Sequence, residues 1–167
     1  RIDTRSSVIA SVYLEPGTRL KMTLSDSVLN KKLLLLNASE ENPTGSGYLV
    51  DDWPQLHRTD FKVARDMWAL LGPRIRNLEK HGIYNQRISA MHEQGMQSLD
   101  IARNALEARH YDLFAEAATR SWALAARVYN DVEKTQKDVL FGVLFYIALF
   151  VPFAFCLERL LFSFTNI

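Results

Sequence analysis

The sequence predicts a mainly α-helical chain with a small N-terminal β layer and an αα-hairpin that leads into a single transmembrane helix. Three observations predict it. The first fifty residues contain short alternating segments, two later stretches carry apolar residues at helical spacing, and an uncharged apolar run extends from Val139 to Leu157.

The N-terminal region, residues 1–58, is expected to be rich in short strands. Its strand-like segments are SSVIASVYL, RLKMTLS and KKLLLLN, and Pro16 with Gly17 predicts a turn between the first two. Residues 38–46 are polar and contain Pro43 and Gly45, which predicts a loop.

A helix is expected to begin near Thr59 or Asp60, because either side chain can cap a helix N-terminus. Gly82 is expected to end it in the left-handed conformation. Gly72 and Pro73 interrupt the pattern, so the segment is either one kinked helix or two short ones.

Two further apolar stripes predict an antiparallel αα-hairpin, which completes a helical domain over residues 59–137. Arg109 and His110 separate the two helices. The first stripe consists of Ile88, Met91, Gly95, Leu99, Ala102 and Leu106, and the second of Phe114, Ala118, Ser121, Ala125, Val128 and Val132.

The run from Val139 to Leu157 predicts a transmembrane helix within residues 138–160. It contains no charge, and as a helix it covers about 28 Å, close to the thickness of the hydrocarbon core. The residues that we expect to span the membrane include Val139, Phe145, Tyr146, Pro152, Phe155 and Leu157.

The two ends of this run differ little in charge, so charge alone does not orient it. Pro152 is expected to kink the helix. Residues 161–167 suit an interfacial tail or the start of a further membrane segment. No proline or glycine lies between Tyr111 and Gly142, so the hairpin helix is expected to continue into the membrane and to transmit motion.

The sequence offers no catalytic constellation, and we expect neither enzymatic activity nor a cofactor. Twenty basic and nineteen acidic residues give a net charge of +1, which argues against nucleic acid as a partner. His92 and Glu93 suggest a zinc-peptidase helix, but the second histidine that it needs is replaced by Met96. The single cysteine, Cys156, cannot form an internal disulfide, and no metal site is expected.

Aromatic residues suggest a junction between the β layer and the helices. Tyr48, Trp53, Phe61 and Trp68 are expected to cluster there, either as a core or as a ligand pocket. Possible contacts with a partner protein are Trp122, Glu158 and Arg159.

The stretches DMWALLGPRIRNLEKHGI, ARNALEARHYDLFAEAATRSWALAARVY and DVLFGVLFYIALFVPFAFCLERLLF resemble a region of large bacterial membrane proteins associated with FtsX-like permeases of the ABC-transporter type. The resemblance implies an extracytoplasmic domain that precedes membrane helices in the bacterial cytoplasmic membrane. It transfers no functional residue, and this chain has one span and no nucleotide-binding motif.

Together these patterns predict an interaction or coupling segment whose partners are the lipid bilayer and other membrane-protein subunits. Two alternatives remain open. The chain could be a single-span accessory subunit of an energy-transducing complex, since ALEARHYDLFAEAA also resembles one tetratricopeptide-like unit. It could also be the C-terminal anchor of an extracytoplasmic hydrolase.

Overall fold

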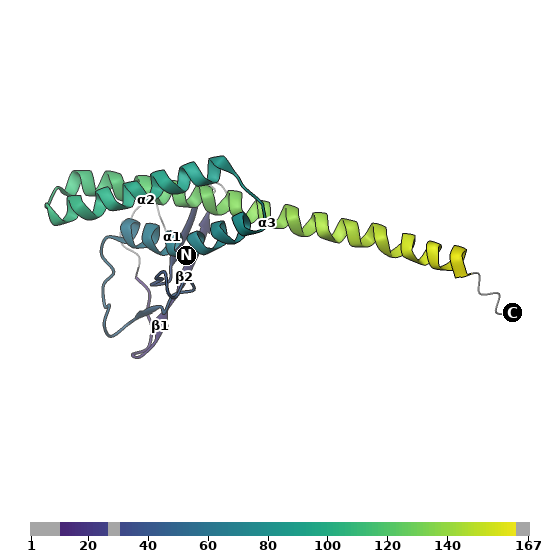
Figure 1. Cartoon of the computed structure of the whole chain (residues 1–167). Helices are drawn as coiled ribbons and strands as arrows, with labels where there is room; N and C mark the ends of the chain where they lie inside the picture. Colours follow the sequence, from purple (N-terminus) through teal and green to yellow (C-terminus); the bar gives the residue numbers. More distant parts are fainter. Residues whose placement is uncertain (1–10, 27–30, 163–167) are drawn as a thin grey trace. The chain divides into compact units, whose positions relative to one another are not determined.

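The computed structural model describes residues 11–26 and 31–162. In this part of the chain four short strands precede three helices (Figure 1), so the predicted mainly α-helical chain with a small N-terminal β layer is confirmed. The strands are β1 (Arg19–Leu20), β2 (Met22–Asp26), β3 (Lys31–Leu35) and β4 (Tyr48–Leu49), and the helices are α1 (Thr59–Lys80), α2 (Gln86–Glu107) and α3 (Tyr111–Phe162).

The strands form two antiparallel pairs. β1 pairs with β4, with Leu20 opposite Tyr48, and β2 pairs with β3, with Met22 opposite Leu35. The loop between β3 and β4 turns back at Gly45, which has φ 72° and whose α-carbon faces the carbonyl oxygen of Leu36 so closely that a Cβ would collide with it. Glycine is therefore required there on both conformational and steric grounds.

Part of the expected β layer is different in the structure. The segment SSVIASVYL was expected to be a strand, but its described part, residues 11–14, is irregular and exposed. Residues 6–10 lie outside the described residues. An alternating pattern forms a strand only where a partner strand is available. In the structure, strand pairing after this segment begins at Arg19, the first residue of β1.

Helix α1 begins at the expected residue without the expected cap. Arg58 occupies the cap position with φ 57°, and no side chain caps the helix. The carboxylate of Asp60 instead accepts a 3.1 Å hydrogen bond from Thr119 of α3. The helix continues through Pro73, so it is one helix and not two.

The C-terminus of α1 is a Schellman motif, which confirms the role expected of Gly82. Gly82 has φ 76° and donates to the carbonyl of Glu79, while Ile83 donates to that of Leu78. Asn85 then caps α2, because its side-chain oxygen accepts from the backbone amides of Arg87 and Ile88.

The predicted hairpin is formed by α2 and the first part of α3. The buried residues of the two predicted stripes include Ile88, Gly95, Leu99, Ala102, Ala118, Ser121, Ala125 and Val128. A second Schellman motif ends α2, in which Arg109 takes the left-handed position with φ 61° and His110 donates to the carbonyl of Ala105. At this turn Phe61 of α1 packs against Phe114 at a ring distance of 5.8 Å.

The chain divides into two compact units, Arg1–Val128 and Tyr129–Ile167. The first contains the strands, α1, α2 and the first part of α3. In the second, the described residues belong to the remainder of α3. The helix is continuous from Tyr111 to Phe162, so the expected helical continuation of the hairpin into the apolar run is confirmed as secondary structure.

Candidate functional site

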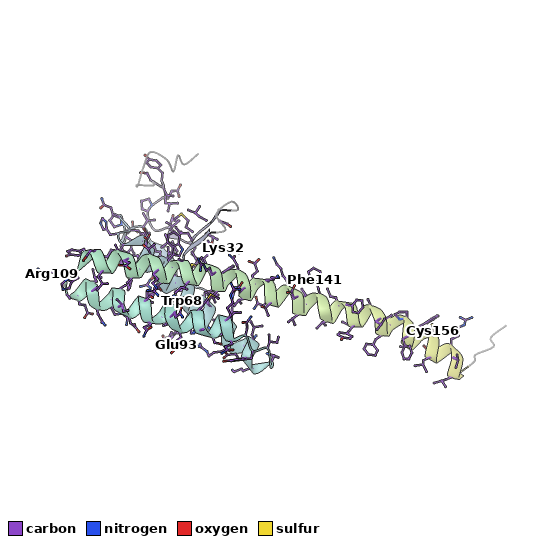
Figure 2. The ribbon with its side chains drawn as sticks, turned by 90° about the horizontal axis from the view of Figure 1, so that it is seen from above. Lys32, Trp68, Glu93, Arg109, Phe141 and Cys156 are labelled. Carbon is purple, nitrogen blue, oxygen red and sulfur yellow. The ribbon has the colours of Figure 1, made fainter. Side chains whose placement is uncertain are left out.

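The apolar part of α3 is the first candidate for a functional element. It contains a stretch long and apolar enough to cross a membrane, and none of that stretch is buried inside the protein. Phe145, Tyr146 and Phe155 are each about 60% exposed. Val139, Pro152 and Leu157 are also exposed. Figure 2 shows side chains that project from this helix around Phe141 and Cys156.

Polar residues precede this stretch on α3. Lys137 and Glu133 form an ion pair of 3.0 Å at i,i+4 spacing, and Thr135 donates to the carbonyl of Asp131. Both bonds lie within the helix; the ion pair has the i,i+4 spacing that stabilises helices, whereas the threonine bond to the carbonyl four residues earlier competes with the backbone. Beyond the apolar stretch, Glu158 and Arg159 are exposed.

A buried carboxylate is the second notable feature. Asp66 of α1 is fully buried, and its side chain accepts hydrogen bonds from the backbone amides of three consecutive residues, Leu36, Asn37 and Ala38, at 2.7–3.2 Å. The hydroxyl of Tyr48 donates to it at 3.1 Å. The guanidinium of Arg65 forms an ion pair with it at 2.9 Å.

This carboxylate fixes the loop after β3 onto α1. Asn37 has φ 51°, a left-handed conformation that turns successive amides toward one anion. Burial, and then the charge of Asp66, raise the pKa of Tyr48 far above its ordinary value, so the phenol stays protonated and donates. All donors come from the chain itself, so the cluster is a structural anchor rather than an open anion-binding or catalytic site.

A cation–π stack lies beside this anchor. The ammonium of Lys62 is 3.6 Å from the centre of the Trp53 ring and 5.4 Å from that of Tyr48, and the two rings meet edge to face at 5.7 Å. Burial, and then the positive charge of Arg65, lower the pKa of Lys62. The lysine therefore occupies the ring face that an external cation would need.

A second polar cluster joins the three helices. The indole Nε1 of Trp68 on α1 donates to the Ser121 hydroxyl on α3 at 2.9 Å, and that hydroxyl donates to the Gly95 carbonyl on α2 at 2.8 Å. A Cβ on Gly95 would collide with the Trp68 ring. In Figure 2 Trp68 lies among the helices, and its 3% exposure places it in the core.

The expected aromatic cluster is therefore wrong as a single group. Tyr48 and Trp53 form the stack with Lys62, Phe61 packs at the hairpin turn, and Trp68 lies between the helices. Phe61 and Trp68 are two helical turns apart on α1, about 10 Å along the axis, which separates them.

Trp122, expected as a possible partner contact, has an intramolecular role. Its Nε1 donates to the carbonyl oxygen of Lys32 on β3 at 2.9 Å, and the ring is half-buried. The bond connects α3 to the β layer. Asp66 was not identified as a candidate from the sequence, although an acidic residue within the apolar face of α1 is a signal of a buried anchor.

His92 packs its ring edge on to Trp68 at 5.3 Å between centroids. Burial, and then the positive charge of Arg76, lower its pKa. Within residues 11–26 and 31–162, histidine, cysteine and acidic side chains form no group of three that could hold a metal ion. His92 is therefore a packing residue of the helical core.

No protein-family model, curated protein or solved structure matches this chain.

Proposed function

We propose that this chain is a membrane-anchored interaction and coupling segment of a multi-subunit membrane assembly of the ABC-transporter type. In this proposal the apolar part of α3 spans the bacterial cytoplasmic membrane once, and residues 1–128 form a domain on its extracytoplasmic side. The observation that carries the proposal is the exposed, uncharged stretch of α3 in a chain whose other helices bury their apolar faces.

The membrane anchor is supported by the free-energy cost of leaving the apolar stretch of α3 in water. Large apolar side chains that remain in water over five helical turns are unfavourable by about 25 cal/mol per Å² of exposed apolar surface. A core helix of a water-soluble protein would bury them, whereas none of this stretch is buried. The bilayer provides the missing apolar environment and matches the length of the run.

The support for a coupling role comes from the way α3 is joined to the domain. Within residues 1–128, α3 is joined to α1 and α2 through Ser121 and to β3 through Trp122. The same helix then continues into the apolar stretch. A helix that belongs to both the domain and the membrane anchor is suited to pass on motion from one to the other.

Membrane insertion is tested by a charged double variant. We expect Leu144→Arg with Ile147→Arg to release the chain from membranes during alkaline carbonate extraction, because each arginine at the centre of a span costs about 2.5–3.5 kcal/mol. The matched control is Ile101→Arg with Leu113→Arg, which alters two similarly exposed residues outside the span. If both double variants stay in the membrane fraction to the same extent as the parent, the apolar stretch is not the anchor.

Orientation can be tested with single cysteines because Cys156 is the sole cysteine. In a Cys156→Ser background, Glu93→Cys places a thiol on the exposed surface of α2, and Glu158→Cys places one beyond the span. A membrane-impermeant maleimide is expected to label position 93 in intact cells and position 158 only after permeabilisation. The reverse pattern would overturn the extracytoplasmic placement.

The assembly is tested by purification from native membranes in mild detergent, followed by mass identification of stoichiometric neighbours. We expect a polytopic permease-type subunit and a nucleotide-binding ATPase. A different energy-transducing complex would favour the accessory-subunit alternative, and recovery of the chain alone would contradict both.

A further inference from the structure

The connection between α1 and α2 lies at the same end of the helical domain as Val128. The contact between Ser121 and Gly95 aligns α2 and α3 in antiparallel directions. Ile88 lies seven residues before Gly95 on α2, and Val128 lies seven residues after Ser121 on α3. Because the two helices are antiparallel, Ile88 and Val128 lie at the same end of the bundle, and both are buried. Figure 1 shows the α1–α2 connection at the end of the bundle opposite the α2–α3 turn.

This end of the domain is basic. Arg76, Lys80 and Arg127 are exposed there, and Tyr84, 70% exposed, lies in the connection itself. Glu79 is the acidic residue within residues 74–88, and Asp131 and Glu133 follow Val128 on α3. Arg74 and Arg87 lie at the same end and already have other interactions. We name Arg76, Lys80, Tyr84 and Arg127 the basic corner.

The opposite end has no such excess of positive charge. Around the α2–α3 turn, acidic and basic side chains alternate and nearly balance: Asp100, Arg103, Glu107, Arg109, Asp112, Glu116 and Arg120. The charge of the bundle is therefore asymmetric along its length, although the whole chain has a net charge of only +1.

The chain leaves the domain at the basic corner. Along the sequence of α3, the first residue of the uncharged run, Val139, follows Val128 by only eleven residues. Once the run is in a bilayer, the length of this connection limits how far the corner can move from the headgroup layer. Anionic lipids attract basic side chains within about a Debye length of the surface, and tyrosine is enriched at the membrane interface.

We propose that the basic corner binds the anionic headgroup surface of the membrane in which α3 is anchored. This inference rests on the proposed membrane anchor and adds a second contact, between the domain and the lipid. We assign a lipid surface rather than an acidic protein as the binding partner, because the short connection between Val128 and the uncharged run limits the distance between the corner and the bilayer.

The test uses the full chain in liposomes, with Cys156→Ser as background and a single fluorophore-labelled cysteine. The label is placed at Tyr84→Cys in the corner, at Leu113→Cys near the α2–α3 turn, or at Phe145→Cys in the span. Liposomes consist of phosphatidylcholine alone or with 30% phosphatidylglycerol, and headgroup nitroxide lipids serve as quenchers.

In phosphatidylglycerol liposomes we expect quenching at position 84 to be at least twice that at position 113. The difference should fall to half or less in phosphatidylcholine alone, in high salt, or with Arg76→Gln, Lys80→Gln and Arg127→Gln combined. The control is Arg103→Gln with Arg120→Gln, on the α2–α3 hairpin away from the corner. It should leave the difference in quenching between positions 84 and 113 unchanged.

The label at position 145 separates the two proposals. If it is shielded from an aqueous quencher while positions 84 and 113 are quenched equally, the corner proposal is overturned and the anchor stands. Quenching at position 84 that does not depend on phosphatidylglycerol or on the three basic residues also overturns it. If position 145 is itself open to the aqueous quencher, the anchor fails and the corner proposal fails with it.

Discussion

The carboxylate of Asp66 accepts a 2.7 Å hydrogen bond from the backbone amide of Asn37, 29 residues earlier in the chain. This bond belongs to the cluster that holds the β layer on α1. Its removal should therefore affect the stability of the whole domain and not only that of one loop.

Asp66→Asn is expected to destabilise the domain by about 2–4 kcal/mol, because an amide group would turn a donor toward the donors of the buried cluster. The measurement is chemical unfolding of the detergent-solubilised chain, followed by near-ultraviolet circular dichroism. Asp100→Asn is the matched control. It removes an exposed ion pair with Arg103 and should cost less than about 1 kcal/mol. Equal effects of the two substitutions would refute the anchor role of Asp66.

Gly95→Ala should destabilise the domain by about 1–3 kcal/mol, since the added methyl group would collide with the rigid Trp68 ring in the core. The same unfolding measurement, combined with tryptophan fluorescence, reports the change. Gly72→Ala is the control within α1. Its Cβ would make ordinary contact with the Arg76 side chain, and the variant should gain up to about 1 kcal/mol from helix propensity. The prediction fails if both alanines are stabilising.

Arg109→Gly should stabilise the chain by about 0.5–1 kcal/mol, because Arg109 has a left-handed backbone in the Schellman motif that ends α2. Arg103→Gly removes the same type of side chain from the interior of the same helix, and it should destabilise by about 1 kcal/mol. The same arginine-to-glycine change is thus expected to raise the melting temperature at position 109 and to lower it at position 103. Shifts of the same sign would contradict this account.

Local patterns predicted the helices well. Gly82 marks the end of α1, and the stripes at Ile88 and Phe114 correspond to the hairpin, because apolar periodicity and left-handed glycine are properties of a short segment. The tertiary clusters were not predictable in this way. Asp66 finds its donors about thirty residues away, and Trp68 meets Gly95 and Ser121 on two other helices. Such contacts depend on tertiary packing, which local patterns in a single sequence do not reveal.

The stability of the helical core is expected to fall as the pH decreases below about 6.5, the ordinary pKa of histidine. Burial against Trp68, and then the positive charge of Arg76, lower the pKa of His92 in the folded state, while Glu79 has a smaller opposing effect. On acidification the unfolded chain therefore binds this proton first. Because the unfolded state then carries more protons, acid favours unfolding until the folded-state pKa is also passed.

His92→Gln should remove this contribution and flatten the decline in unfolding free energy between pH 7.5 and pH 5.5. Denaturant unfolding at a series of pH values gives the slope directly. His110→Gln, at an exposed position before α3, serves as the control for the loss of one imidazole. If the His92 variant shows the same pH dependence as the parent, the imidazole protonates equally in the folded and unfolded chains, and its contact with Trp68 does not disfavour the charged form.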